Sequence, residues 1–593
     1  PISVGSENVA LGNQALDDGS LTGGCNTAIG TCVLTNNTTG CLNTGVGFRS
    51  LAGNTTGARN TAFGRNTLCN NTTGGFNTAV GLDSMFENTT GSCNTAVGRS
   101  SLLCNTEGSF NVAIGQNSLG ANTTADNNTA VGMCSLFANT TGFRNTALGG
   151  HALCSNTTAP DNMAIGFCAM HSNTTGGDNI SIGNFSLGSN TTGNNNLALG
   201  LSSLCGNTTG CYNHALGRNA LRCNTTASNN TAVGYQSLCA NTTGACNVAV
   251  GGEAFCSNTT GDCSTMLGYR AGRCNTTGRR NTFVGHLTGN LNTNGCFNTA
   301  VGGGDSPGWP TFNYNTTGSY NVALGNGSLK SNTTASNNTA VGYQSLWSNT
   351  TGSENTAIGR NTLGLNTTGR YNVAVGDNAL DANTTAGCNT AIGRVSLSSN
   401  TTGAQNTAVG YQALYDNTTA SYNTAIGFCS LRANTTGVEN TSIGYQSNLQ
   451  GTGSYNTTLG SSAGCTLSTG SCNTLVGWIA GRTGSPFTVT TQNNRIVMGQ
   501  SSVTNAYIQV AWTVTSDARD KMNISNVPHG LDFVNQLNPV SFNFKKDRDT
   551  EIPHGNKRYG FLAQDILALE GDDNVIIDNE QPDKLKYQGE ALV

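Results

Sequence analysis

Charged residues are scarce in this chain of 593 residues: they make up only 10%, and the formal net charge is −4. Neither nucleic acid nor an anionic membrane is therefore an expected partner. Long apolar runs are also missing, since none approaches the ~20 residues that a membrane-spanning helix needs. We expect no membrane insertion. The chain opens at Pro1 without a signal-peptide pattern, which suggests a processed or incomplete start.

Low charge combined with 79 glycines and many Asn and Thr residues could also indicate disorder. A disordered repeat, however, has no reason to hold an apolar column in strict register over hundreds of residues. Such a column is present here, so we expect an ordered protein.

The ordered pattern is a repeat of 17 residues, typified by NTAVGYQSLCANTTGAC at 230–246. Units begin at Asn26 and every 17 residues thereafter as far as Asn298, and the register resumes from Asn321 to Asn440. A unit this short cannot bury its own apolar side and must stack on its neighbours. The period therefore predicts a solenoid.

Each unit contains two short apolar segments separated by Gly and by Asn-Thr-Thr-Gly, which is too little for a helix. We predict two short strands joined by two tight corners, and hence an all-β, parallel β-solenoid of the β-roll or β-helix kind. The second residue of the first strand is usually Ala, as at Ala28, Ala79 and Ala130. Either another surface comes very close to this column, or the inside of the coil is crowded; the sequence leaves both open.

Three domains are expected: the repeat stalk at 1–482, a β-rich neck at 483–515, and a charged, partly helical domain at 516–593. The stalk has an insertion near 301–320, with the sequence GGGDSPGWPTFNYN at 302–315. Loops inserted at coil corners are where solenoids often place recognition surfaces, although a tolerated insertion explains the same residues.

The Asn-Thr-Thr corners are also N-glycosylation sequons. Turn chemistry explains them equally well, because Asn tolerates left-handed backbone and Thr hydroxyls bond to the turn. The candidate glycosylation sites are Asn37, Asn54, Asn71, Asn88, Asn122, Asn139, Asn241 and Asn349.

Cysteines recur at equivalent places in successive coils, which would put their Cα atoms ~4.8 Å apart, within disulfide range. On this basis Cys239 is predicted to pair with Cys256, and Cys246 with Cys263. The chain has no CxxC pair and its six His residues are scattered, so we expect no metal site and no cofactor.

The C-terminal part contains SDARDKMNIS at 516–525, LNPVSFNFKK at 537–546 and GFLAQD at 560–565. These motifs, in this order, resemble the intramolecular chaperone domain of phage tailspikes and tail fibres, peptidase S74 of the endosialidase type. The resemblance spans 516–587. It implies a domain that trimerises and folds the β-structured stalk before it, and then cuts itself off.

Carried over by position, the resemblance makes Ser516 the nucleophile, Lys521 the general base, and Thr515–Ser516 the scissile bond. A Ser-Lys dyad requires burial that lowers the pKa of the Lys, so that it can accept the Ser proton. Without the resemblance, Ser516 would be interpreted as a helix N-cap and Lys521 as a solvated charge.

The coils are also similar to the head repeats of trimeric autotransporter adhesins, which share the Asn-x-Ala-(Ile/Val)-Gly phrase but have a shorter period. The combined pattern predicts a homotrimeric viral tail or capsid fibre, on the virion surface or otherwise extracellular, that binds a host receptor or glycan. The alternative is a cellular trimeric adhesin or extracellular filament. A glycan-degrading tailspike is disfavoured because the coils contain no recurrent pair of carboxylates.

Overall fold

The computed structural model describes residues 7–304, 308–483, 485, 487–504, 507, 530–545, 551–570, 576–578 and 586–587. The chain forms two compact units, 1–371 and 372–593, which are treated separately below.

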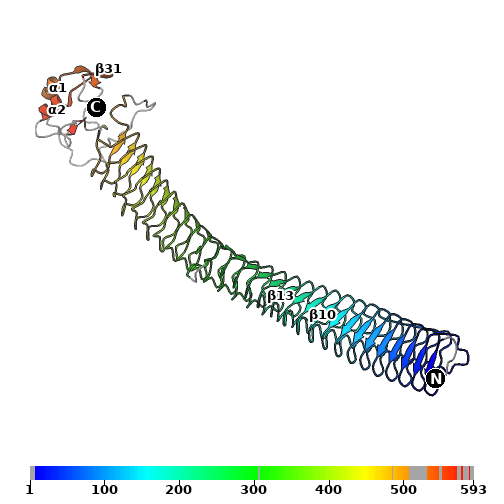
Figure 1. Ribbon diagram of the computed structural model, residues 1–593. Coiled ribbons are helices and arrows are strands. Elements are labelled where there is room, and N and C mark those ends of the chain that lie inside the picture. Colours follow the sequence, from blue (N-terminus) through cyan, green and yellow to red (C-terminus); the bar gives the residue numbers. More distant parts are fainter. Residues whose placement is uncertain are drawn as a thin grey trace. The chain divides into compact units, whose positions relative to one another are not determined.

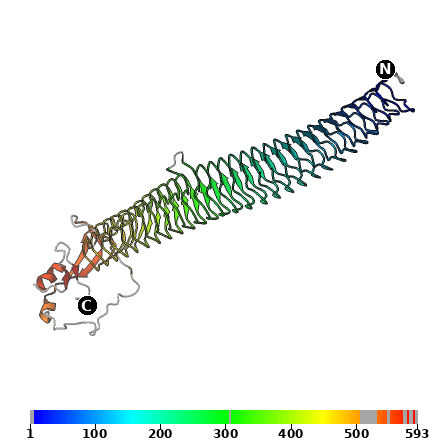
Figure 2. The ribbon, with the colours of Figure 1, turned by 90° about the horizontal axis from the view of Figure 1, so that it is seen from below.

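The first unit is a solenoid in which each coil contributes one strand of three residues. Successive strands pair in parallel and in chain order, and the coils follow one another in both ribbon views (Figure 1 and Figure 2). The strands are β1 (Val9–Leu11), β2 (Thr27–Ile29), β3 (Thr44–Val46), β4 (Thr61–Phe63), β5 (Thr78–Val80), β6 (Thr95–Val97), β7 (Val112–Ile114), β8 (Thr129–Val131), β9 (Thr146–Leu148), β10 (Met163–Ile165), β11 (Ile180–Ile182), β12 (Leu197–Leu199), β13 (His214–Leu216), β14 (Thr231–Val233), β15 (Val248–Val250), β16 (Thr265–Leu267), β17 (Thr282–Val284), β18 (Thr299–Val301), β19 (Val322–Leu324), β20 (Thr339–Val341) and β21 (Thr356–Ile358).

Equivalent residues of neighbouring coils face each other, which confirms the predicted 17-residue coil. Between β4 and β5, for example, Ala62 lies opposite Ala79. The register also survives the insertion, because β18 pairs with β19 with Val301 opposite Leu324. The parallel β-solenoid expected from the period is therefore the fold of this unit.

The middle residue of each strand points into the coil, and the residues on either side point outward. Ala28, Ala79 and Ala130 are fully buried inside their own coils. Of the two explanations for the small residue at this position, crowding within the coil is correct.

The predicted second strand is wrong. The segment that carries the Leu column is a series of turns, in which alternate residues have positive φ, such as Cys32 at 57° and Leu34 at 49°. Its N–H groups still bond to the next coil, as Leu34 N–H does to Ser50 O at 3.2 Å. Positive φ is costly for a Leu, but the buried position of the side chain and these inter-coil bonds hold the backbone there.

The interior keeps its volume by exchanging large and small residues between two columns. In two coils the inward residue of the strand is larger than Ala: it is Met266 in one and Phe283 in the other. In these coils the residue in the Leu column is smaller, Gly272 or Gly289. A Cβ on Gly289, which has a φ of +60°, would lie 2.5 Å from the ring of Phe283. The two columns therefore share one space, and only the combined volume of their side chains is fixed.

This exchange predicts strong coupling between Phe283 and Gly289. Gly289→Leu should destabilise the coil by about 3 kcal/mol through overpacking, and Phe283→Ala by a similar amount through a cavity. The double variant restores the Ala/Leu pair of ordinary coils and should recover about 2 kcal/mol or more.

Hydrogen exchange of the amides in coil 281–297 measures these local opening free energies. Gly252→Ala is the control, because it adds a methyl group two coils away, where a Cβ would meet only the Tyr269 ring at 3.4 Å, and it should change little. Simple addition of the two single effects in the double variant would show that the columns are independent.

The second unit begins with the same architecture: the strands from β22 to β29 are parallel and pair in chain order. The bounds are β22 (Val373–Val375), β23 (Thr390–Ile392), β24 (Thr407–Val409), β25 (Thr424–Ile426), β26 (Thr441–Ile443), β27 (Thr457–Leu459), β28 (Thr474–Val476) and β29 (Ile496–Met498).

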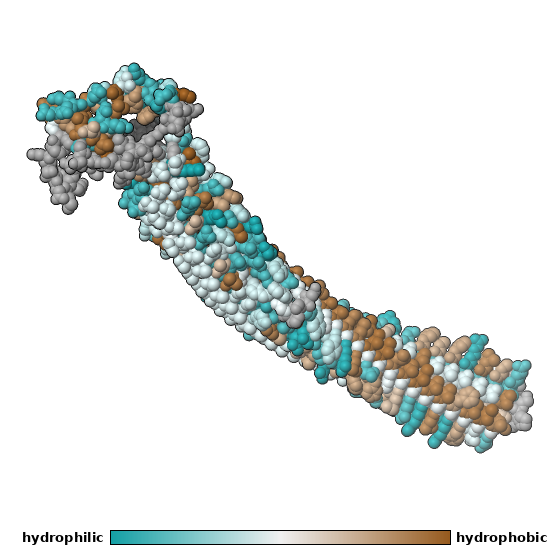
Figure 3. All heavy atoms as spheres, turned by 60° about the vertical axis from the view of Figure 1, so that its left-hand side comes forward, coloured by the Kyte–Doolittle hydropathy of each residue, from teal (hydrophilic) through white to brown (hydrophobic). Residues whose placement is uncertain are grey.

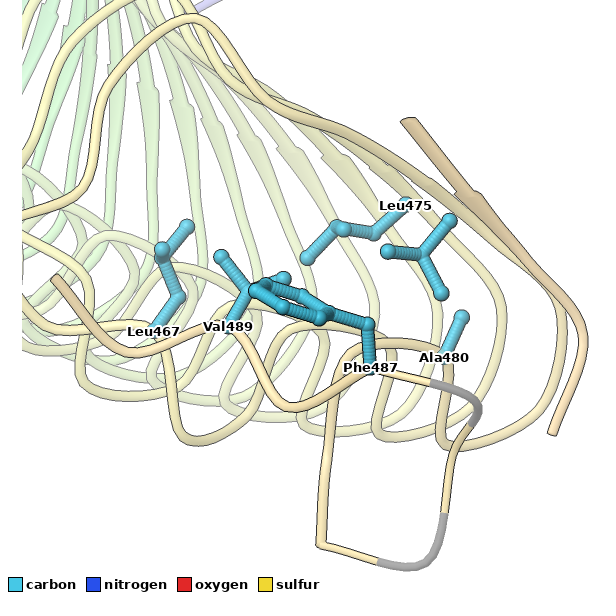
Figure 4. Packing of buried hydrophobic residues seen from close by; sticks show 6 residues of the cluster. Leu467, Leu475, Ala480, Phe487 and Val489 are labelled. Carbon is cyan, nitrogen blue, oxygen red and sulfur yellow. The ribbon is translucent and has the colours of Figure 1, made fainter. Parts of the chain in front are cut away.

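The solenoid continues past residue 482, where its sequence signature ends. β29 lies in the expected neck, yet it pairs with β28 with Val476 opposite Met498. Beneath these strands lies an apolar cluster, in which Leu475, Phe487 and Val489 face one another (Figure 4).

The described residues from 530 onward form a small α+β part of the second unit. Its described elements are α1 (Leu531–Gln536), β30 (Val540–Lys545), β31 (Pro553–Gly560), α2 (Ala563–Glu570), β32 (Ile577–Asp578) and β33 (Lys586–Tyr587). β30 and β31 are antiparallel, as are β32 and β33. Of the helices that the structure describes, none has the length and apolar character to span a bilayer.

Candidate functional site

The outward face of the strands is the first candidate, because it exposes a column of large apolar residues. Every strand places its third residue there, and that residue is usually Ile, Val, Leu or Phe. In the first unit, for example, Ile114 and Leu148 of this column are each about 40% exposed. Figure 3 shows apolar residues gathered in bands along the N-terminal part of this unit. Other exposed members of the column are Ile29, Phe63, Val80, Ile182 and Leu267.

The Asn-Thr-Thr corners form a ladder inside the coils. Asn54 Nδ2 donates to Asn37 Oδ1 of the preceding coil at 2.8 Å and to Gly57 O of its own corner at 3.0 Å. The leading Asn of each repeat forms a second ladder, in which Asn43 N–H donates to Asn26 Oδ1 at 2.9 Å. Each amide thereby closes its own coil and ties it to the next, which satisfies polar groups whose burial would otherwise cost ~1–3 kcal/mol apiece.

The same ladder bears on the candidate glycosylation sites, which remain predictions. All eight candidate side chains are fully buried, and the Nδ2 that would carry a glycan is already a hydrogen-bond donor, as in Asn71 and Asn241. A glycan at this atom would have to occupy the interior and break the ladder. The structure supports turn chemistry as the reason for the corner sequence. The buried candidates are Asn37, Asn54, Asn71, Asn88, Asn122, Asn139, Asn241 and Asn349.

The structure places the predicted cysteine pairs on adjacent coils. All 22 cysteines are free thiols in the structure, so the two disulfides remain predictions. The Cys239 thiol donates a hydrogen bond to Cys256, which lowers the pKa of Cys256 to about 7 and raises that of Cys239. Burial, together with the nearby Asp262 and Cys246, raises the pKa of Cys263. No three His, Cys, Asp or Glu side chains converge as metal ligands in the part of the chain that the structure describes.

This hydrogen bond predicts pH-dependent reactivity at Cys256. Its pKa is lowered, so the reactive thiolate should accumulate as the pH rises through about 7. Cys239→Ala removes the donor, returns the pKa toward its usual value, and should slow alkylation at pH 7 by about five- to tenfold.

Iodoacetamide labelling followed by peptide mass mapping measures this rate, and oxidation of the wild type should link the same two peptides. Cys246→Ala, which removes the thiol that interacts with Cys263 instead, should leave the rate at Cys256 unchanged. Equal rates with and without Cys239 would rule out the proposed donor.

The α+β part brings two of its sequence motifs together. The LNPVSF segment runs into β30, and the start of β30 pairs with the end of β31, with Val540 opposite Gly560. Gly560 opens the GFLAQD segment, which leads directly into α2. Side chains from both motifs, including Leu537 and Phe561, pack against a buried cluster of Ile566, Ile576 and Ile577.

A buried carboxylate fixes the far end of α2. Glu570 is almost fully buried, and its two oxygens accept the N–H groups of Ile576 and of Ile577, the latter at 3.0 Å. The order of these motifs along the chain agrees with the comparison with known families. Residues 516–575 match the family described as chaperone of endosialidase, peptidase S74.

The predicted Ser516, Lys521 and Thr515–Ser516 bond lie in or next to the start of this chaperone of endosialidase segment, outside the residues that the structure describes. Their roles therefore remain predictions. No curated protein and no solved structure matches the chain.

Proposed function

We propose that this chain is the subunit of a homotrimeric viral surface fibre, exposed on the virion, that attaches to a host receptor or glycan. The observation that carries the proposal is the order of its parts: a long run of parallel β-coils followed by a chaperone of endosialidase segment. That family is associated with trimerisation of the β-structured stalk before it.

The outward face of the strands supports a trimer. A regular apolar column that continues from coil to coil is the kind of exposed patch that marks a contact with another protein surface. A second and a third copy of the same chain offer the same column at the same spacing, so symmetric packing would cover all three. Burial of each such side chain contributes ~1.5–3 kcal/mol when complete.

The chaperone segment would prevent the coils from pairing out of register during folding. A slip of one coil satisfies nearly the same backbone bonds, because equivalent residues already face one another in every pair. A clamp that joins three chains at one end fixes the register before the stalk assembles. We propose that Ser516 and Lys521 then cut the Thr515–Ser516 bond, which would leave the stalk trapped in its assembled form.

Sedimentation equilibrium of the full-length chain tests the oligomer. We expect a mass three times that of the 60.9 kDa chain, or of the stalk fragment once cleavage is complete. A mass of one chain at micromolar concentration would overturn the proposal. A trimer that binds neither cells nor glycans would retain the architecture but remove host attachment.

A further inference from the structure

The inserted loop in the first unit adds an aromatic cluster that the coil does not need. After β18, the buried Thr311 and Phe312 return the chain to the regular path: Thr311 Oγ1 donates to Gly325 O at 2.8 Å. Strand pairing continues without a shift into β19. Trp309 comes before this return and remains 37% exposed, so its role lies outside the core.

Trp309 reaches past the next coil to aromatic residues of the coil after it. Its ring lies 4.9 Å from that of Trp347 and 6.0 Å from that of Tyr343, with an interplanar angle of 21° to the latter. Gly327, on the intervening coil, leaves the room: a Cβ there would lie 2.5 Å from the Trp347 ring. The intervening coil therefore leaves room for the Trp347 ring, which Trp309 contacts.

A cation lies at the edge of this cluster. Lys330 Nζ is 4.0 Å from the centroid of the Trp347 ring, and burial lowers the pKa of Lys330. Among the residues that the structure describes, no carboxylate pairs with Lys330. The Gln344 side chain also borders Gly327, because its Cγ lies 3.5 Å from the position that a Cβ on Gly327 would occupy.

We infer that Trp309, Lys330, Tyr343 and Trp347 form a binding site for an acidic saccharide; this deepens the proposed function and rests on it. Exposed aromatic rings accept the apolar face of a sugar ring, the Gln344 amide can bond its hydroxyls, and Lys330 attracts its acid group. A peptide added as a strand is disfavoured, because β19 and β20 are already paired on both edges.

An oligosaccharide array tests the site, with uronate-, sialate- and sulfate-containing glycans, each beside its uncharged counterpart. The full-length protein should bind at least one acidic glycan, and Trp309→Ala should weaken that binding at least tenfold. Lys330→Gln should reduce the preference for the acidic member of each pair. Tyr212→Ala, which removes an exposed aromatic ring elsewhere in the same unit, is the control and should bind like the wild type.

Wild-type protein that binds no acidic glycan, or a Trp309→Ala variant that binds as well as the wild type, would overturn the inference. Sedimentation of the same samples separates this failure from a failure of the fibre proposal. A trimer without the site leaves the fibre intact, whereas a monomer removes both. The trimer mass of Trp309→Ala also shows that the variant folds.

Discussion

Ser516→Ala should abolish cleavage, so that the variant stays at full length while the wild-type chain releases a fragment that begins at Ser516. The reason is that the Ser516 hydroxyl is the proposed nucleophile. Its oxygen attacks the carbonyl carbon of Thr515 while Lys521 takes the hydroxyl proton. Lys521 then gives this proton to the peptide nitrogen, which leaves as the new amino terminus of Ser516. Water hydrolyses the resulting ester and leaves a carboxylate on Thr515.

Lys521 sharpens the test, because its role depends on losing a proton. Lys521→Ala should slow cleavage by about 10²–10⁴-fold, the usual contribution of a general base. Lys521→Arg should be equally slow, since Arg keeps its charge and cannot accept the proton. Ser525→Ala, in the same segment but outside the proposed dyad, is the matched control and should cleave normally.

Intact-mass analysis with sequencing of the new amino terminus reads out all four variants. Identical fragment patterns in the wild type and Ser516→Ala would disprove the autoprotease. A fragment that begins elsewhere than Ser516 would move the scissile bond, and with it the assignment of the nucleophile.

The repeat itself was predictable because each coil obeys the same local chemistry. The 17-residue step from Asn60 to Asn77 is the distance between two rungs of the Asn ladder, and it sets the pairing of β4 with β5. Stacking follows once a coil cannot bury its own apolar side. The period therefore gave both the fold class and the register.

The orientation of the side chains was harder to predict, since alternation in a strand does not say which face is inside. The volume exchange between Phe283 and Gly289 is visible in the sequence only when both columns are compared. The positive φ of Leu34 has no signal in Leu itself. A weak signal lies two residues before the Leu position, where several other coils have Asn or Asp, such as Asn66 and Asp83. These residue types tolerate left-handed backbone.

The predicted glycosylation sites depend on a feature that a sequon does not contain. A sequon contains the residues that N-glycosylation requires, but the accessibility of Asn Nδ2 depends on how the corner folds. In these coils the Asn side chain turns inward, and the second Thr, such as Thr124 or Thr158, is the exposed member of the corner. Residue identity alone could not separate these two outcomes.

The exposed strand column gives the other large effect. Ile114→Lys/Leu148→Lys places two charges on the proposed trimer face, two coils apart, where each would be buried without a partner. We expect the trimer to dissociate to folded monomers. The matched control is Thr124→Lys/Thr158→Lys, which adds the same charges at the same spacing on the exposed corner and should remain trimeric.

Sedimentation equilibrium measures the mass of both variants, and far-ultraviolet circular dichroism shows whether the coils persist. The outward side chains do not fill the interior, so the Lys substitutions on the strands should leave the coil of a monomer intact. A face variant that remains trimeric would exclude this column as the interface. Dissociation of both variants alike would trace the effect to net charge rather than to the strand face, because the two differ only in where the lysines stand.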